Sequence, residues 1–147
     1  MTSPPSSIVQ TSMLDALLGY HLRRAQSAVF AELMQTLSDD QVTPGQFGVL
    51  TLIHENAGLN QSTLANALGI ERSTMVGVID VLEKRGLVAR QKSKTDKRAH
   101  ALALSTEGKR LLKSVVPKVK RHEKDIACTL SADEVKTLVA LLRKVAR

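Results

Sequence analysis

The chain has 147 residues, 43% of them hydrophobic, which is enough for one domain with a buried core and excludes global disorder. A formal net charge of +7 favours a polyanionic partner. Only 2% of the residues are aromatic, which argues against single-stranded nucleic acid, usually held by base stacking, and leaves double-stranded DNA as the favoured polyanion.

Targeting and redox features point to one compartment. The N-terminus lacks a basic start followed by an apolar run, and no apolar stretch approaches bilayer length, so neither a signal peptide nor a membrane span is expected. The single cysteine, Cys128, excludes an intramolecular disulfide and is typical of a reducing compartment. We therefore expect a cytoplasmic protein, in which Cys128 serves packing rather than redox sensing.

The N-terminal part is predicted to be an arm followed by one long helix. Residues 1–11 are rich in Ser, Pro and Thr, which is typical of a flexible arm. From Ser12 to about Leu37, apolar residues recur at helical spacing and predict a helix with one continuous apolar stripe. The stripe consists of Leu14, Leu18, Leu22, Ala25, Val29, Leu33 and Leu37.

Explicit start and stop signals follow. The segment TPGQ at 43–46 has the order of an N-cap, a proline at the first helical position and a capping box, and predicts a helix to residue 55. Asn60 caps a short helix that Gly69 stops in a left-handed conformation. The next helix, over 71–85, ends at Gly86. Two short helices joined by a tight turn predict a helix-turn-helix.

A basic hairpin is predicted directly after these helices. The segments LVARQ and HALALS alternate apolar and polar residues, as half-buried strands do, and the loop KSKTDKRAH joins them. Ser105 then caps a helix that Pro117 bends or delays. A capping box at 131–134 opens the last helix. Its apolar face consists of Leu138, Leu141, Leu142 and Val145.

A hairpin directly after a helix-turn-helix is a wing. The apolar stripes of the first and last helices exceed what a small winged domain can cover. We therefore expect a two-fold homodimer, which presents two DNA-binding domains to a pseudo-palindromic site in double-stranded DNA. The expected organisation is a flexible arm at 1–11, dimerisation helices at 12–40 and 109–147, and a winged helix-turn-helix domain at 41–108.

The helix over 71–85 is predicted to read DNA. Its core face consists of Met75, Val78, Ile79 and Leu82. The expected DNA contacts on the other side are Arg72, Ser73, Thr74, Val76, Gly77 and Lys84, joined by Asn60, Gln61 and Ser62 from the preceding helix. Arg72 is suited to bidentate pairing with guanine, and its alternative is an ion pair with a neighbouring glutamate. Gly77 suggests a close approach, or is an ordinary surface glycine.

Two charged residues at the end of this helix are assigned different roles. Asp80 would repel phosphate, so we expect it to orient a nearby arginine. Arg85 is expected to face the DNA backbone together with Lys84.

The loop between the strands is predicted to enter the minor groove, where negative potential is concentrated. Asp96 is interpreted as an anchor that holds Arg98 or Lys97 in a fixed direction. The alternative is a solvated loop. The wing residues in this prediction are Lys92, Lys94, Asp96, Lys97 and Arg98.

The run GIERSTMVGVIDVLEKRGLVARQKSKTDKRAHALALSTEG resembles the winged helix-turn-helix signature of the MarR family of bacterial transcription regulators, and the resemblance extends across nearly the whole chain. It implies a mainly α-helical fold with a small β-hairpin wing, flanked by the N- and C-terminal dimerisation helices of a homodimer. Family members place the recognition helix in the major groove and a wing arginine in the minor groove. Their usual wing reads Asp-Arg-Arg, whereas this one reads Asp96-Lys97-Arg98, so the inserted residue is Lys97 or Arg98.

The resemblance also implies a small-molecule effector that releases DNA. Family members bind small, often aromatic anions between the dimerisation helices and the winged domain. The segment LLGYHLRRAQSAVFAEL is similar to first helices in members that respond to aromatic acids or their coenzyme A thioesters. The candidate pocket residues are Tyr20, His21, Arg23, Arg24, Phe47 and His54. The alternatives are a core role for Phe47, surface or satisfied histidines, and a solvated arginine pair.

Other classes of protein find little support. No Gly-rich phosphate loop, paired-Cys spacing or HExxH-type motif occurs, and the four histidines are scattered, so we predict no catalytic residue, metal or cofactor. We expect a dimeric, sequence-specific, ligand-responsive transcription regulator, and a repressor rather than an activator. The alternatives are a regulator without an effector and a winged helix used for protein interaction or as an architectural DNA-binding module.

Overall fold

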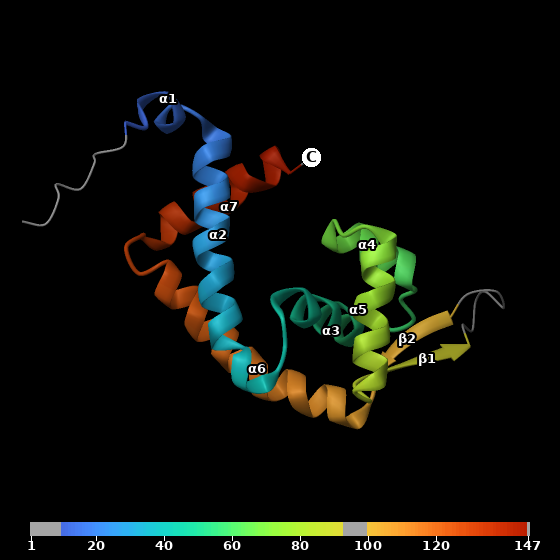
Figure 1. The fold of residues 1–147 in the computed structure, drawn as a ribbon. Coiled ribbons are helices and arrows are strands. Elements are labelled where there is room, and N and C mark those ends of the chain that lie inside the picture. The colour runs from blue at the N-terminus through green and yellow to red at the C-terminus, as the bar shows by residue number, and fades with distance from the viewer. Residues whose placement is uncertain (1–9, 93–99, 147) are drawn as a thin grey trace, which may run out of the picture.

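A computed structural model describes residues 10–92 and 100–146 (Figure 1). The elements in chain order are α1 (Ser12–Asp15), α2 (Leu18–Thr36), the 3-10 helix η1 (Ser38–Asp40), α3 (Pro44–Glu55), α4 (Gln61–Leu68), α5 (Arg72–Lys84), β1 (Val88–Lys92), β2 (His100–Leu104), α6 (Thr106–Ile126) and α7 (Ala132–Val145). Over the described ranges, no helix is both long and apolar enough to cross a membrane.

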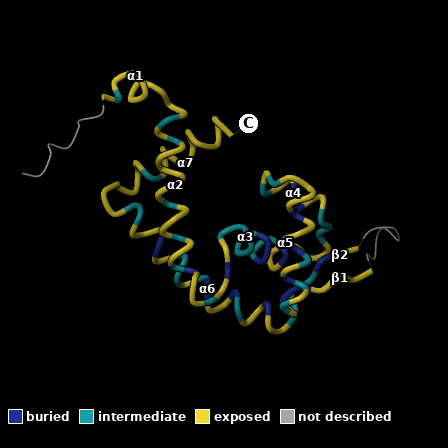
Figure 2. The backbone as a smooth tube through the Cα atoms, in the orientation of Figure 1, coloured by how far each residue is buried: buried dark blue, intermediate teal, exposed yellow. Residues whose placement is uncertain are grey.

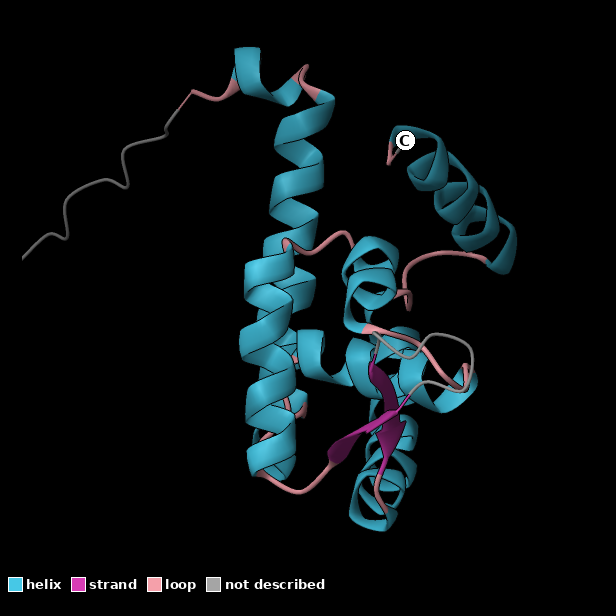
Figure 3. Cartoon of the chain, turned by 90° about the vertical axis from the view of Figure 1, so that its right-hand side faces the viewer, coloured by secondary structure: helices cyan, strands magenta, loops and turns pink. Residues whose placement is uncertain are grey.

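The elements form two parts that α6 connects. Helices α3, α4 and α5 pack together with the β1–β2 hairpin and form the winged part (Figure 1). Helix α2 lies against the C-terminal half of α6. Helix α6 begins beside β2 and runs across to α2, so one continuous helix joins the winged part to the long N-terminal helix. Figure 3, viewed from the side, shows α7 standing clear of the winged part.

The main core lies in the winged part, where α3, α4, α5, the hairpin and the start of α6 meet. Its fully buried side chains include Leu50, Leu64, Met75, Ile79 and Leu82. Burying side chains of this size stabilises the fold by roughly 1.5–3 kcal/mol each. A smaller cluster joins α2 to α6 and contains Leu37, Val42 and Val115.

Helices α1, α2 and α7 bury no residue completely, and Figure 2 shows them almost entirely exposed. Many of their large apolar side chains are on the surface of the single chain. These are Met13, Leu14, Leu17, Leu18, Phe30, Met34, Leu138, Val139, Leu141, Leu142 and Val145. Of the stripe expected on the first helix, Leu14 and Leu18 are exposed, whereas Leu37 is buried in the smaller cluster and Leu33 packs against it. The apolar face expected on the last helix is exposed throughout. That a second copy covers these exposed side chains stays a prediction.

The prediction of one unbroken helix from Ser12 to Leu37 is wrong. The helix is interrupted after Asp15, because Leu17 takes an extended conformation with φ −97° and ψ 120°. Local polar contacts replace the helical pairing there: His21 Nε2 lies 2.8 Å from the carbonyl oxygen of Asp15, and Thr11 Oγ1 donates to the Asp15 carboxylate at 2.7 Å. Side-chain bonds of this kind compete with helical hydrogen bonds.

The predicted caps are confirmed. The Thr43–Gln46 capping box opens α3, Asn60 caps α4, and Gly69 ends α4 at φ 62°. The Ser131–Glu134 box opens α7, and chiefly the hydrogen bond from the Ser131 backbone N–H holds the pKa of Glu134 below its ordinary value. Helix α6 runs from Thr106 to Ile126 with Pro117 inside it, so the proline does not delay its start.

A tight junction holds the hairpin to α6. The strands pair antiparallel from Val88 opposite Leu104 to Lys92 opposite His100. At their base Ser105 caps α6, and its hydroxyl also donates to the carbonyl of Gly86 at 2.6 Å. Gly108, in the first turn of α6, lies against the Leu87 backbone so closely that a Cβ there would be 2.1 Å from the Leu87 carbonyl oxygen.

Candidate nucleic-acid interface

Helix α5 divides into a buried face and an exposed face, as the sequence predicts. Met75, Ile79 and Leu82 are buried, and Val78 packs against the same core. All six candidate DNA contacts on α5 are exposed: Arg72, Ser73, Thr74, Val76, Gly77 and Lys84. A Cβ added at Gly77 would meet no atom within 4 Å, so no contact within the described part of the chain requires glycine there.

The three candidates before α5 lie at the start of α4. The Asn60 side-chain oxygen accepts hydrogen bonds from the Thr63 backbone N–H at 2.9 Å and from its hydroxyl at 3.1 Å. Capping therefore occupies that oxygen and leaves the amide nitrogen for an outside contact. Gln61 is half-buried and Ser62 is exposed in the first turn.

A three-residue ion-pair cluster joins α5 to the first strand of the hairpin. Arg90 on β1 donates from one guanidinium nitrogen to Asp80 Oδ1 at 3.0 Å and from the other to Glu83. The expectation that Asp80 orients a nearby arginine is confirmed, and the arginine is Arg90. We call Asp80, Glu83 and Arg90 the Arg90 fork. It holds the hairpin against α5, and the Arg90 charge offsets one of the two carboxylate charges beside the predicted DNA contacts.

The prediction for Arg85 is wrong. Its guanidinium donates to the backbone carbonyls of Gln41 and Asp40, so it ties the end of α5 to the turn after α2 and does not face DNA. The Asp40 carboxylate in turn pairs with Lys118 of α6 at 2.5 Å. This turn therefore connects α2, α5 and α6, and no local sequence signal predicts so distant a contact.

The wing candidates fall on both sides of the limit of the described residues. Lys92 is exposed at the end of β1, opposite His100. The other candidates lie outside the described residues: Lys94, Asp96, Lys97 and Arg98. The hairpin that carries them projects past α5, on the side away from α2 (Figure 1).

The candidate effector residues lie in three places. Tyr20, His21, Arg23 and Arg24 cluster on α2, where the Tyr20 and His21 rings meet edge to face at 5.5 Å and both guanidinium carbons lie within 5.7 Å of the Tyr20 ring centre. Phe47 on α3 is half-buried and packs against both core clusters, which agrees with the alternative that it is a core residue. His54 is exposed near the end of α3.

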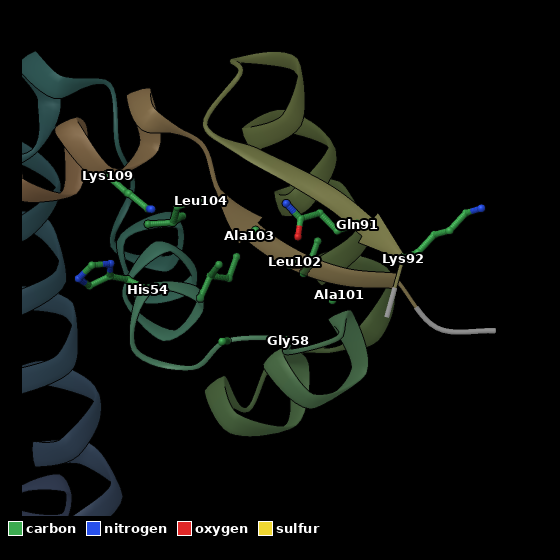
Figure 4. A pocket seen from close by; sticks show the side chains of 11 residues that line it. His54, Gly58, Gln91, Lys92, Ala101, Leu102, Ala103, Leu104 and Lys109 are labelled. Carbon is green, nitrogen blue, oxygen red and sulfur yellow. The ribbon is translucent and has the colours of Figure 1, made fainter. Parts of the chain in front are cut away.

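His54 lines a hollow of about 540 Å³ between α3, the hairpin and the start of α6 (Figure 4). Its other lining residues are Ile53, Ala57, Gly58, Gln91, Lys92, Ala101, Leu102, Ala103, Leu104 and Lys109. Figure 4 shows His54 and Lys109 near one end and Lys92 at the other. The lining combines apolar side chains with cationic ones and contains no carboxylate, which suits an anion with an apolar body.

The sequence interpretation missed three residues. Arg90 lies two residues after Val88 on β1, and side chains two residues apart in a strand lie on the same face. The alternation of the strand was therefore enough to predict that Arg90 faces α5. Glu83 lies one turn after Asp80 and was detectable in the same way. His122 is buried between α2 and α6, and nothing in its local sequence indicated this. Among the described residues, no group of three or more His, Cys, Asp or Glu side chains is placed to hold a metal.

Comparison with known proteins agrees with this geometry. Residues 42–100 match the family model of the MarR family. A Thauera aromatica protein named "Putative transcriptional regulatory protein for hcr operon" is 40% identical over 131 residues, which cover 88% of this chain and 79% of that protein. The fold class predicted from the sequence is confirmed by the solved structures that follow.

Two structures of the transcriptional repressor CouR are similar to nearly the whole chain. CouR bound to a 23-mer DNA duplex is 39% identical with a TM-score of 0.89, covering 96% of this chain and 100% of that one. CouR bound to p-coumaroyl-CoA is 37% identical with a TM-score of 0.86, covering 95% of this chain and 98% of that one.

Proposed function

The chain belongs to the MarR family of transcription regulators, and we propose that it acts in the cytoplasm as a dimeric repressor of genes next to a pseudo-palindromic operator in double-stranded DNA. The observation that carries this proposal is the similarity over almost the full chain to a repressor in complex with a DNA duplex. Family membership at this level concerns regulators and not enzymes.

The exposed face of α5 supports the assignment of the DNA-reading surface. Arg72 opens the helix, where its guanidinium and the free backbone N–H groups of the first turn are both available to an anion. Arg72 reads a guanine in the major groove, and Ser73 and Thr74 contact bases or phosphates beside it. The flat surface at Gly77 allows a close approach of the duplex, and the hairpin carries its cations to the adjacent minor groove.

The exposed apolar side chains of α1, α2 and α7 support a dimer through these helices. Residues 12–40 and 109–147 are the dimerisation helices in this proposal, and residues 41–108 read DNA. Seven or more leucine and valine side chains left in water would be costly, since full burial of each stabilises by roughly 1.5–3 kcal/mol. A two-fold partner is the commonest way to cover such a surface.

The effector in this proposal is an aromatic acid or, preferably, its coenzyme A thioester. The similarity to CouR bound to p-coumaroyl-CoA supports this class. Two features of this chain fit it: the Tyr20 ring between two arginines on α2, and the hollow that Lys92, His54 and Lys109 line. The first suits stacking and phosphate pairing, and the second suits an apolar acyl group with an anionic neighbour.

A fluorescence anisotropy titration tests the effector class. The full-length protein on a labelled operator fragment is titrated with p-coumaroyl-CoA, with free p-coumarate and with coenzyme A. We expect release by the thioester at lower concentration than by either part. Release by coenzyme A alone at equal concentration would contradict an aromatic effector. Specific DNA binding that none of the three compounds changes would favour a regulator without an effector.

Two matched variants refine the same assay. Lys109→Gln removes a cation from the hollow, whereas Lys113→Gln removes one from the next turn of α6, outside the hollow. We expect Lys109→Gln alone to require more thioester for release. Equal responses of both variants would place the ligand elsewhere.

A further inference from the structure

One face of the β1–β2 hairpin changes from apolar to basic along its length. Arg90 pairs with Leu102, and Lys92 pairs with His100. Residues directly opposite each other, and residues two apart in a strand, lie on the same face, so these four side chains share one face. Leu102 is buried in the core, whereas His100 is exposed at the end of β2. The far end of this face therefore carries an imidazole beside two cationic side chains.

His100 lines a hollow of about 280 Å³ between the hairpin and the start of α4. The other lining residues are Asn60, Gln61, Ser62, Arg90 and Leu102. None of the six is acidic, and all except Leu102 carry a side-chain hydrogen-bond donor. The hollow therefore suits an anion that has several acceptor oxygens.

The start of α4 adds further donors to the hollow. The Asn60 side-chain oxygen is occupied by the cap with Thr63, which leaves its amide nitrogen as a donor. The backbone N–H groups of Gln61 and Ser62 lie in the first turn of α4 and have no partner within the helix. Both features favour a negatively charged group at this end of the hollow.

The charged side chains around the hollow come from the hairpin and α5. Arg90 is paired with Asp80 and Glu83, and Lys92 stands opposite His100. Helix α4 has no charged residue, and α3 and α6, which also pack against β2, contribute no residue to the lining. Histidine is the side chain whose charge ordinarily changes between pH 5 and 8. Among the described residues of the lining, His100 is the one of this type.

The position of the hollow matches the path of a DNA backbone. In a duplex, one sugar-phosphate backbone separates the major groove from the minor groove beside it. The proposed function places α5 in the major groove and the loop of the hairpin in the minor groove. That backbone must then cross the surface between them, where the hairpin contacts both α4 and α5 (Figure 1).

We infer that this hollow binds a DNA phosphate and that His100 takes up a proton when the phosphate is bound. The protonated imidazole donates to one phosphate oxygen, while Asn60, Ser62 and the first-turn N–H groups of α4 donate to the others. A neutral imidazole supplies no charge, so operator affinity falls as the pH rises. This inference rests on the proposed DNA binding, to which it adds a dependence on pH.

The dependence of operator affinity on salt concentration tests the inference. The full-length protein is titrated by anisotropy onto a labelled operator duplex selected from genomic fragments, at about pH 6 and about pH 8. Each phosphate contact contributes about −0.9 to the slope of log affinity against log salt concentration. A dimer has two His100 side chains, so the slope should be steeper by up to about 1.8 at the lower pH. The affinity should be roughly twofold to thirtyfold higher there, the gain from two exposed ion pairs.

Three variants separate His100 from a general effect of pH. His100→Gln keeps a neutral donor and should show the shallower slope at both pH values. His100→Arg keeps a permanent cation and should show the steeper slope at both. Lys113→His added to His100→Gln restores the number of histidines on the exposed side of α6, outside the hollow, and should leave the slope independent of pH.

The results that would overturn this site differ from those that would overturn DNA binding. An operator bound with equal slopes at both pH values would overturn the site and leave the proposed function intact. A slope that still depends on pH in His100→Gln would do the same. Failure to bind any duplex at either pH would overturn the proposed function, and this site with it.

Discussion

Replacing Arg90 with glutamine should weaken operator binding and leave the fold largely intact. The side chains of the Arg90 fork keep between 26% and 46% of their surface exposed, so solvent screening limits the contribution of the ion pairs to folding to roughly 1 kcal/mol. The effect on DNA comes from charge, because Arg90→Gln changes the net charge of the fork from −1 to −2 on the helix that we propose faces the duplex.

The magnitude follows from Coulomb's law. With a phosphate about 8 Å from each carboxylate and an effective dielectric constant of roughly 20–80, each uncompensated charge costs about 0.5–2 kcal/mol. Because Arg90 carries one positive charge, its loss makes the net charge of the fork more negative by one unit. At 1.4 kcal/mol for each tenfold in affinity, a cost of about 0.5–2 kcal/mol is roughly a twofold to thirtyfold loss. The loss should shrink as salt is added, because exposed charges are screened.

Anisotropy on one operator fragment at several salt concentrations measures this loss, with a melting curve as the check on folding. The matched control is Arg110→Gln, which breaks an exposed ion pair with Glu107 on α6 and should leave DNA binding unchanged. Adding Asp80→Asn and Glu83→Gln to Arg90→Gln removes the repulsion and should restore most of the affinity. If the triple variant bound no better than Arg90→Gln alone, neutralisation would not be the role of Arg90.

Four further outcomes are expected. Arg72→Ala should cost roughly 1–3 kcal/mol at the operator and relax its specificity, and unchanged affinity in the same anisotropy assay would remove Arg72 from the reading surface. Gly108→Ala should destabilise the fold by roughly 1–3 kcal/mol in thermal unfolding, because its Cβ would meet the Leu87 carbonyl, and a variant as stable as wild type would refute the close contact. Gly77→Ala has free space around its Cβ, so it should stabilise α5 by up to about 1 kcal/mol while weakening DNA binding. The pKa of Glu134 is lowered in the folded chain, so the contribution of Glu134 to stability is complete above the ordinary glutamate pKa, about 4.3, and is lost as the pH falls below it. Glu134→Gln should therefore flatten the acid side of the curve of unfolding free energy against pH. An unchanged acid slope would contradict this.

Local signals in the sequence were sufficient for most of the elements. Caps depend on residues three positions apart, so the boxes at Thr43 and Ser131 and the glycine stop at Gly69 are visible without tertiary information. The core face of α5 follows from helical periodicity alone. These elements were predicted correctly because their stabilising contacts lie within one or two turns.

Features that depend on distant contacts were predicted less well. Arg85 reaches back more than forty residues to the turn after α2, and His122 is buried only because α6 crosses α2. The break at Leu17 depends on side-chain bonds that compete with an otherwise helical pattern. The family resemblance predicted one pocket that contains all the effector candidates. In the fold they lie in three separate places: on α2, in the core and at the end of α3.

The most direct test of a sequence-specific repressor is a selection of fragmented genomic DNA on the purified full-length protein, sequenced at two salt concentrations. A dimer with two α5 helices should recover a few inverted-repeat sites whose half-sites are about 10–10.5 base pairs apart, and these should persist at the higher salt. Diffuse recovery that disappears at the higher salt would contradict specific reading of DNA and would favour an architectural or protein-binding role.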